Sequence, residues 1–254
     1  MGKFSKILIT LNLGLGLAVA NENLRMADSC YAARAENAYG DKADAKNVKQ
    51  MISAYKLAME DSSVQEKATE GLVKSLYFSL RFVPFPKNKR MEHLDTLYRT
   101  AEAAYNKYPK NKEIAHIYAT SLSMWGAEKG PLQSVKEGVA AKVRDVATAA
   151  NDYQILGRAH QLLPYIPLIL SWPDKKLADK FLTKALEQDP KDIYNYFFLA
   201  ELRFDQKRYA DALDLIDRGL ARGVRTNNFL EDKRGRWHLK ELQKKINAKL
   251  DKKL

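Results

Sequence analysis

The chain has 254 residues, a mass of 28.9 kDa and a formal net charge of +12. This length is enough to bury a substantial core, and only 12 glycines and 8 prolines argue against long disordered linkers. The 43 basic residues are interleaved with 31 acidic ones through most of the chain, whereas nucleic-acid-binding proteins gather basic residues on one groove-facing element. Composition therefore argues against nucleic acid as a partner and leaves acidic proteins and anionic membrane surfaces open.

The first twenty residues have the pattern of a secretory signal peptide. Lys3 and Lys6 precede an apolar run over residues 7–17, and Ala18-Val19-Ala20 supplies the small residues that signal peptidase requires. The run is shorter than the roughly 20 apolar residues of a membrane-spanning helix. We expect cleavage after Ala20, which leaves residues 21–254 as a periplasmic chain without a membrane-spanning segment; an uncleaved anchor is the alternative.

Helical hairpins are predicted through the first half of the mature chain, because apolar residues recur at intervals of three and four. The first pairs a helix over residues 22–39 with one over 48–58. The second places Gly71 and Ser75 where helices approach closely, contains the apolar proline loop 82–86, and is closed by Pro109. The third pairs residues 114–125 with 132–146, after the start signal Gly130-Pro131.

The fourth and fifth hairpins carry the clearest pattern, over residues 153–224. In the fifth, Tyr196, Leu199, Ala200 and Phe204 share one helical face, and small residues occur where helices must approach. The fourth has an insertion of nine residues relative to the fifth, in a loop that holds Pro164, Pro167 and Trp172-Pro173.

A last helix over residues 229–250 is predicted after Asn228. Its apolar stripe is formed by Leu239, Leu242, Ile246 and Leu250, and its opposite face is rich in lysine. A terminal helix with a polar outer face covers the last hairpin of a helical array and keeps the protein soluble. The same lysines also suit a basic arm that contacts an acidic partner.

The spacing of these hairpins resembles the tetratricopeptide repeat (TPR), a unit of about 34 residues in which proline closes the second helix. Pro190 occupies that place, and the next equivalent position, Val224, follows without a gap. We therefore predict an all-α, TPR-like helical-hairpin solenoid over residues 21–254, a single domain with a C-terminal capping helix. Such arrays present concave binding surfaces.

Three stretches together resemble the T component of TRAP-type solute transporters, a family distantly similar in fold to eukaryotic regulators of microtubule dynamics. They are residues 156–190 with their proline-rich insertion, 227–246, and 113–126. The resemblance implies a periplasmic protein that associates with an extracytoplasmic solute-binding protein. It is also compatible with a homo-oligomer that has a pocket or a pore. Two features depart from the family: a glycine pair is missing after Leu163-Pro164, and Cys30 is not placed as a lipoprotein cysteine.

No pattern of catalytic, metal-ligating or cofactor-binding residues is evident. His93, His116, His160 and His238 lie on different predicted helices, none in a metalloprotease spacing. Cys30 is the sole cysteine, which excludes an internal disulfide. We therefore expect a binding protein and not an enzyme, with no metal and no cofactor.

The candidate binding groove follows the first helices of the fourth and fifth hairpins, as in TPR arrays. Its residues are those off the packing stripe, namely Gln154, Arg158, Gln161, Tyr194, Phe197 and Glu201. Arg158 is expected to pair a carboxylate, and Tyr194 and Phe197 to form apolar walls for a partner protein or a small apolar or anionic ligand. The alternative function is a cell-envelope scaffold that contacts anionic surfaces through the basic C-terminal helix.

Overall fold

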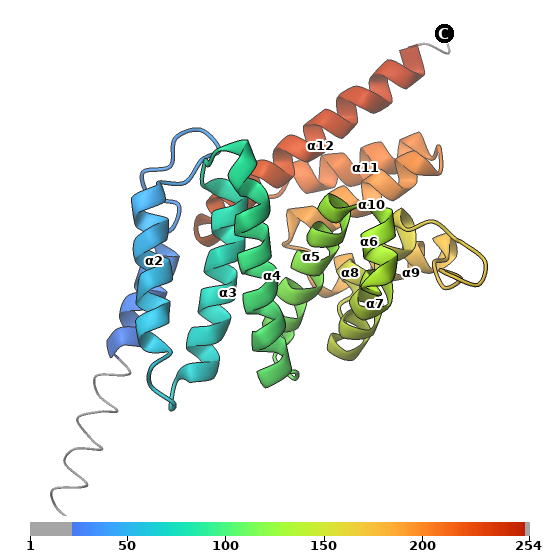
Figure 1. Cartoon of the computed structure of the whole chain (residues 1–254). Helices are drawn as coiled ribbons and strands as arrows, with labels where there is room; N and C mark the ends of the chain where they lie inside the picture. Colours follow the sequence, from blue (N-terminus) through green and yellow to red (C-terminus); the bar gives the residue numbers. More distant parts are fainter. Residues whose placement is uncertain (1–21, 252–254) are drawn as a thin grey trace, which may run out of the picture. The chain divides into compact units, whose positions relative to one another are not determined.

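The computed structural model describes residues 22–251 (Figure 1). The predicted signal peptide lies outside these residues. Within them the chain consists of α-helices and short 3₁₀ turns without a β-strand, so the prediction of an all-α fold of successive helical hairpins is confirmed. No helix in residues 22–251 is both long and apolar enough to cross a membrane. The chain divides into two compact units, one ending at Ile117 and one beginning at Tyr118.

The first unit contains the first two predicted hairpins. Residues 22–32 are helical and are followed by α2 (Ala45–Ala58), α3 (Gln65–Phe82), the 3₁₀ turn η1 (Lys87–Lys89), α4 (Arg90–Lys107) and the start of α5 (Lys112–Lys129). The first helix ends earlier than residue 39 because the backbone changes to tight i→i+3 bonds, from Arg34 N–H to the Tyr31 carbonyl and from Glu36 N–H to the Ala33 carbonyl. Asn37 then takes a left-handed conformation, with φ of 57°.

Gly71 is a point of close approach, as predicted. A Cβ atom on this residue would come within 2.0 Å of the Tyr55 ring of α2. Tyr55 also donates a hydrogen bond of 2.7 Å to Asp28 of the first helix. Burial, and then this hydrogen bond, raise the pKa of the Tyr55 hydroxyl well above its ordinary value. One tyrosine thus joins three helices of the first unit.

The second unit continues from α5 through α6 (Pro131–Lys136), α7 (Val139–Ala150), α8 (Tyr153–Leu162), α9 (Lys175–Gln188), α10 (Ile193–Asp205), α11 (Tyr209–Leu220), η2 (Thr226–Asn228) and α12 (Phe229–Leu250). One helix was predicted over residues 132–146, and the structure divides it at Gly138. This glycine has φ of +64°, a conformation that breaks the helical path and that glycine adopts without steric penalty.

The core of the second unit lies between α9, α10, α11 and α12. Tyr196, Leu199 and Ala200 are buried in it, as predicted from their helical spacing. Gly157 and Gly219 set the closest approaches: a Cβ on Gly157 would meet Leu182 of α9, and one on Gly219 would meet Tyr196 and Leu239. The terminal helix α12 packs on both α10 and α11, so it caps the fifth hairpin as expected.

Candidate functional site

Four of the six predicted groove residues, Gln154, Arg158, Gln161 and Glu201, lie where α8 packs beside α10. Gln154, Arg158 and Gln161 are four and three residues apart, which places them on one face of α8. Each bonds to a side chain of α10 or of its N-cap. We call this row of contacts the α8–α10 polar seam, formed by Gln154, Arg158, Gln161, Asp192, Asn195, Glu201 and Asp205.

The seam has short, regular contacts along its length. Gln154 Nε2 donates to Asn195 Oδ1 at 2.7 Å and to Asp192 Oδ2 at 3.0 Å. Arg158 Nη1 donates to Glu201 Oε2 at 2.6 Å, and Gln161 Nε2 donates to Asp205 Oδ2 at 2.9 Å. The seam therefore joins the fourth hairpin to the fifth through side chains that hold one another in position.

Arg158 already has a carboxylate partner within its own chain. Its guanidinium pairs with Glu201 and lies 4.3 Å from the centre of the Phe198 ring, an arrangement that favours a cation. Both side chains of the pair are partly exposed. An acidic ligand that approached Arg158 would have to compete with Glu201. Both residues were predicted for the groove, but their pairing was not.

Tyr194 and Phe197 belong to an aromatic cluster at the side of the seam. The cluster consists of Tyr194, Phe197, Phe198, Trp237 and His238. Phe197 stacks on His238 of α12, with ring centres 4.9 Å apart and an interplanar angle of 27°. Trp237 continues the cluster to the surface, where 56% of the residue is exposed. Phe197 therefore packs against α12. The residues around Phe197 in the sequence did not predict this contact.

The contribution of α12 depends on a glycine that the sequence analysis did not single out. A Cβ on Gly235 would come within 2.9 Å of Ile193 Cγ2 and 3.5 Å of the Tyr194 ring. The bare backbone at this position lets α12 lie against the start of α10, which carries His238 to Phe197. The signal that could have found it is the glycine itself, inside a helix otherwise made of long side chains.

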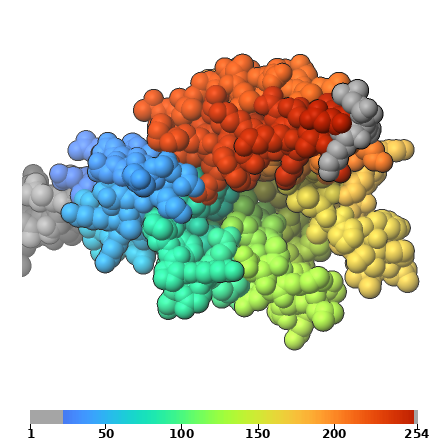
Figure 2. Space-filling view, turned by 90° about the horizontal axis from the view of Figure 1, so that it is seen from above, coloured from blue at the N-terminus to red at the C-terminus, as the bar shows by residue number. Residues whose placement is uncertain are grey.

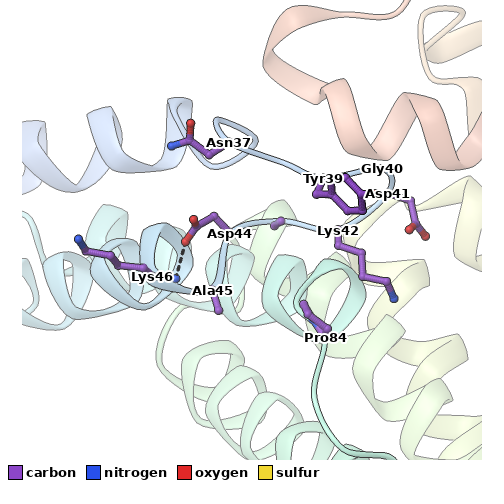
Figure 3. Close-up of a pocket in the computed structure, with 10 residues that line it drawn as sticks. Asn37, Tyr39, Gly40, Asp41, Lys42, Asp44, Ala45, Lys46 and Pro84 are labelled. Carbon is purple, nitrogen blue, oxygen red and sulfur yellow. Dashed lines mark hydrogen bonds between the residues drawn. The ribbon is translucent and has the colours of Figure 1, made fainter.

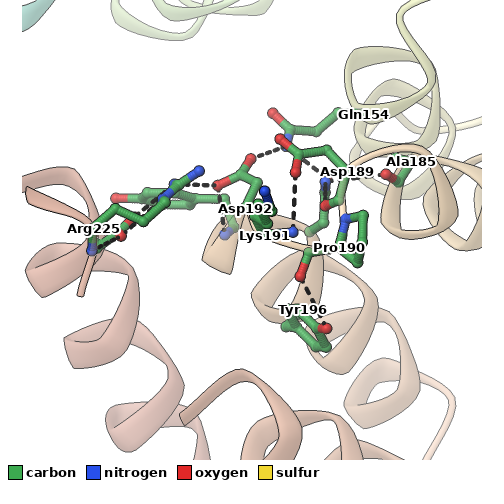
Figure 4. Close-up of polar contacts among 11 residues, drawn as sticks. Gln154, Ala185, Asp189, Pro190, Lys191, Asp192, Tyr196 and Arg225 are labelled. Carbon is green, nitrogen blue, oxygen red and sulfur yellow. Dashed lines mark hydrogen bonds and ion pairs between the residues drawn. The ribbon is translucent and has the colours of Figure 1, made fainter. Parts of the chain in front are cut away.

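The turn that joins α9 to α10 supports the seam from one end (Figure 4). Asn195 is buried and donates to the carbonyls of Ala185 and Asp189, at 3.1 and 3.0 Å. Asp192 accepts from the Tyr194 N–H at 3.1 Å and so caps α10. Burial raises the pKa of the Asp192 carboxyl, while the bonds from Tyr194 and Gln154 act in the opposite direction. The polar side chains at this end of the seam therefore have hydrogen-bond partners within the chain.

The inserted segment between α8 and α9, residues 163–174, is anchored at its base. Asp174 N–H donates to His160 Nδ1 at 2.9 Å, and the Trp172 ring meets the His160 ring edge-on at 5.0 Å. Burial lowers the pKa of His160, although the charge of Asp174 acts in the opposite direction. Beyond this base the side chains of Tyr165, Leu168 and Ile169 are exposed. In Figure 1 this segment, in yellow, extends away from α8 and α9.

Two open hollows of about 490 Å³ each lie elsewhere. One is in the first unit, lined largely by the loop 37–46 and Pro84 (Figure 3). The other lies between α9, α10 and α11 and is bordered by Arg203, Arg218 and Arg222 together with acidic side chains. Neither is lined by any of the six predicted residues.

The residues that the structure describes hold no cluster of histidine, cysteine or carboxylate side chains suited to a metal ion. No family model matches the chain, and no curated protein matches it in sequence. The geometry of the second unit is therefore what supports a functional assignment.

Proposed function

We propose that the chain is a non-catalytic adaptor that binds a partner protein along the α8–α10 polar seam and the adjoining aromatic cluster. The observation that carries this proposal is that the seven seam residues, from two successive hairpins, form one continuous row whose side chains already bond to one another. Side chains that are ordered before binding lose less conformational freedom on binding. Half-exposed Trp237, beside this row, is the type of residue that dominates binding energy at interfaces.

For the partner we propose an extracytoplasmic solute-binding protein of a TRAP-type system, with the mature chain in the periplasm. The resemblance of residues 156–190 and 227–246 to that family's T component supports this choice, as does the signal-peptide pattern. Assembly into a homo-oligomer and a small apolar or anionic ligand fit the same proposal. The mature chain, without Lys3 and Lys6, keeps a basic net charge of +10, which would accelerate association with an acidic partner.

A charge swap tests the seam without removing its internal ion pair. In R158E/E201R the two charges exchange places, so the contact between α8 and α10 is kept while the charges offered to a partner are reversed. With the chain from Asn21 as bait in a periplasmic extract, the wild type is expected to recover a solute-binding protein and the swapped variant is not.

The matched control is R218D/D214R, which reverses an exposed pair on α11 and is expected to leave capture unchanged. Equal capture by wild type and R158E/E201R, with both proteins folded by circular dichroism, would remove the seam from the interface. A second variant, Trp237→Ala, should weaken capture by tenfold or more, on the order of 1.4 kcal/mol or above.

A second candidate function, an envelope scaffold, rests on α12. Its Lys240, Lys244, Lys245 and Lys249 are exposed, while Leu242 and Ile246 are buried. Because a deletion of this helix would remove buried side chains, replacement of the four lysines by glutamine is the cleaner test. Loss of the protein from envelope fractions would favour the scaffold, and unchanged fractionation would exclude it.

A further inference from the structure

Residues 162–173 form the longest uncharged stretch within the described part of the chain that is also exposed. Their sequence is LLPYIPLILSWP, in a protein in which 29% of residues are charged. Five large apolar residues in it are exposed, namely Leu162, Tyr165, Ile166, Leu168 and Ile169. In the space-filling view of Figure 2, the yellow atoms of this segment form a lobe at the surface of the second unit. We call residues 163–174 the α8–α9 loop and Leu168-Ile169 its tip.

The backbone of the loop directs its most apolar residues outward. Ile166 and Leu170 form an isolated antiparallel bridge, with N–H to carbonyl distances of 2.9 and 2.7 Å. The bridge closes a narrow turn in which Leu168 has φ of +67° and is fully exposed, at 102% of the reference area. Glycine or asparagine is the ordinary residue for this conformation. A leucine is unfavourable here both in backbone energy and in hydration, so the fold itself gives no reason for it.

Several contacts fix the base of the loop. Besides the bond from Asp174 to His160, the Lys175 ammonium donates to the Gln161 carbonyl. The guanidinium of Arg144 lies 5.6 Å from the centre of the Trp172 ring. A tip carried by a fixed base has less conformational freedom to lose when it meets a partner.

Cations outnumber carboxylates by one at this base. Arg144, Lys175 and Lys176 lie at or next to it, while Asp145 pairs with Arg144 and Asp174 caps α9 through the Lys176 N–H. Tyr165 and Trp172 lie between the tip and these cations along the chain. An apolar tip, then aromatic rings, then cations is the order of side chains found from the interior of a bilayer outward to its headgroups.

We propose that the α8–α9 loop inserts its tip into the surface of an anionic lipid bilayer and holds the protein there peripherally. Burial of the tip in the headgroup–acyl boundary supplies the apolar part of the interaction. The basic residues of the base and the net charge, which is +10 in the chain from Asn21 because Lys3 and Lys6 are absent, supply attraction to anionic headgroups. A second copy of the loop is a poorer occupant, because the cations at the two bases would then face each other.

The test is sedimentation of the chain from Asn21, which retains every described residue, with vesicles. Wild type is expected to bind vesicles of phosphatidylglycerol and phosphatidylcholine, and to bind phosphatidylcholine alone more weakly. The variant L168S/I169S should lower the partition coefficient by about tenfold for each side chain that inserts. K175Q/K176Q should lower it by about fivefold per lysine on anionic vesicles only.

The matched control is L132S/V135S on α6, which removes two other exposed apolar side chains of the same unit and should leave partitioning unchanged. Equal loss in L132S/V135S and L168S/I169S would overturn the proposal, as would full binding by the tip variant. If wild type instead self-associates without lipid and L168S/I169S is monomeric in sedimentation velocity, the loop joins two copies and the lipid proposal fails. Capture of a protein partner is assayed without vesicles, so that experiment tests the adaptor proposal independently of the lipid proposal.

Discussion

The fourth and fifth hairpins differ mainly in the segment that joins their two helices. In the fifth, α10 and α11 are joined by Gln206-Lys207-Arg208, and the Arg208 N–H bonds to the Arg203 carbonyl at 2.9 Å, a standard helix ending. In the fourth, the twelve residues of the α8–α9 loop serve the same connection. Each connection contains one non-glycine residue at positive φ, Lys207 at 61° and Leu168 at 67°. A short polar connection is therefore enough for a hairpin of this type, and the apolar loop is an addition to it.

The largest loss of stability is expected for a substitution in the turn between α9 and α10. Both hairpins depend on this turn, because it joins them. Asn195→Ala removes the donors to the Ala185 and Asp189 carbonyls and the acceptor for Gln154. Leaving such groups unsatisfied should lower the free energy of unfolding by about 3 kcal/mol, as measured by urea denaturation. The exposed Asn247→Ala on α12 is the control. A loss no larger than in that control would mean that the turn adjusts without Asn195.

Close helix packing should be equally demanding in the two hairpins. At Gly157 a Cβ would lie 2.6 Å from Leu182 Cγ and 3.0 Å from the Leu182 backbone nitrogen, and at Gly219 it would lie 2.9 Å from Tyr196 Cβ. Gly157→Ala and Gly219→Ala should each destabilise the chain by about 2 kcal/mol in chemical denaturation. Gly223→Ala, where no atom lies within 4 Å, should be nearly neutral. A large difference between the first two would show that the hairpins do not pack alike.

Substitutions at Leu168 and Lys207, the two positive-φ residues of these connections, distinguish an effect on stability from an effect on lipid binding. Leu168→Gly and Lys207→Gly should each raise stability by about 0.5 to 1 kcal/mol, because glycine relieves the left-handed conformation but gains freedom in the unfolded chain. Thermal unfolding measures both. Only Leu168→Gly should also weaken vesicle partitioning, so a parallel loss in Lys207→Gly would contradict the assignment of the tip.

The smallest effect concerns pH and belongs to the fourth hairpin alone. Burial lowers the pKa of His160 below the 6.5 of an exposed histidine, so the unfolded chain binds the proton more readily. The neutral His160 ring contributes its full share of stability above pH 6.5. This contribution is lost as the pH falls through the lowered pKa of the folded state. His160→Asn, which keeps an acceptor for Asp174, should flatten this part of the curve of stability against pH. An unchanged curve would mean that the folded and unfolded states bind the His160 proton equally well.

The helices were predictable because their apolar residues keep the helical period, as Tyr196, Leu199 and Ala200 do. The division at Gly138 was missed because it depends on one φ angle, which the apolar pattern around it does not record. The early end of the first helix, after residue 32, has a similar origin in backbone turns.

The seam could be predicted in part. Spacing on one helix places Gln154, Arg158 and Gln161 together, and the repeat places Glu201 on the matching face of α10. Spacing does not reveal which residues face each other across two helices, so the pairing of Arg158 with Glu201 came only from the structure. The same holds for His238 against Phe197, since α12 follows no repeat period.

Gly219 is in contact with two helices at once, through Tyr196 of α10 and Leu239 of α12. None of the three helices α10, α11 and α12 can move away without exposing the surface that the other two bury at this point. Their backbone amides should therefore exchange with deuterium through one shared opening and not by fraying from the C-terminal end. The last three helices would then form a single cooperative unit, whose most protected amides lie around Gly219.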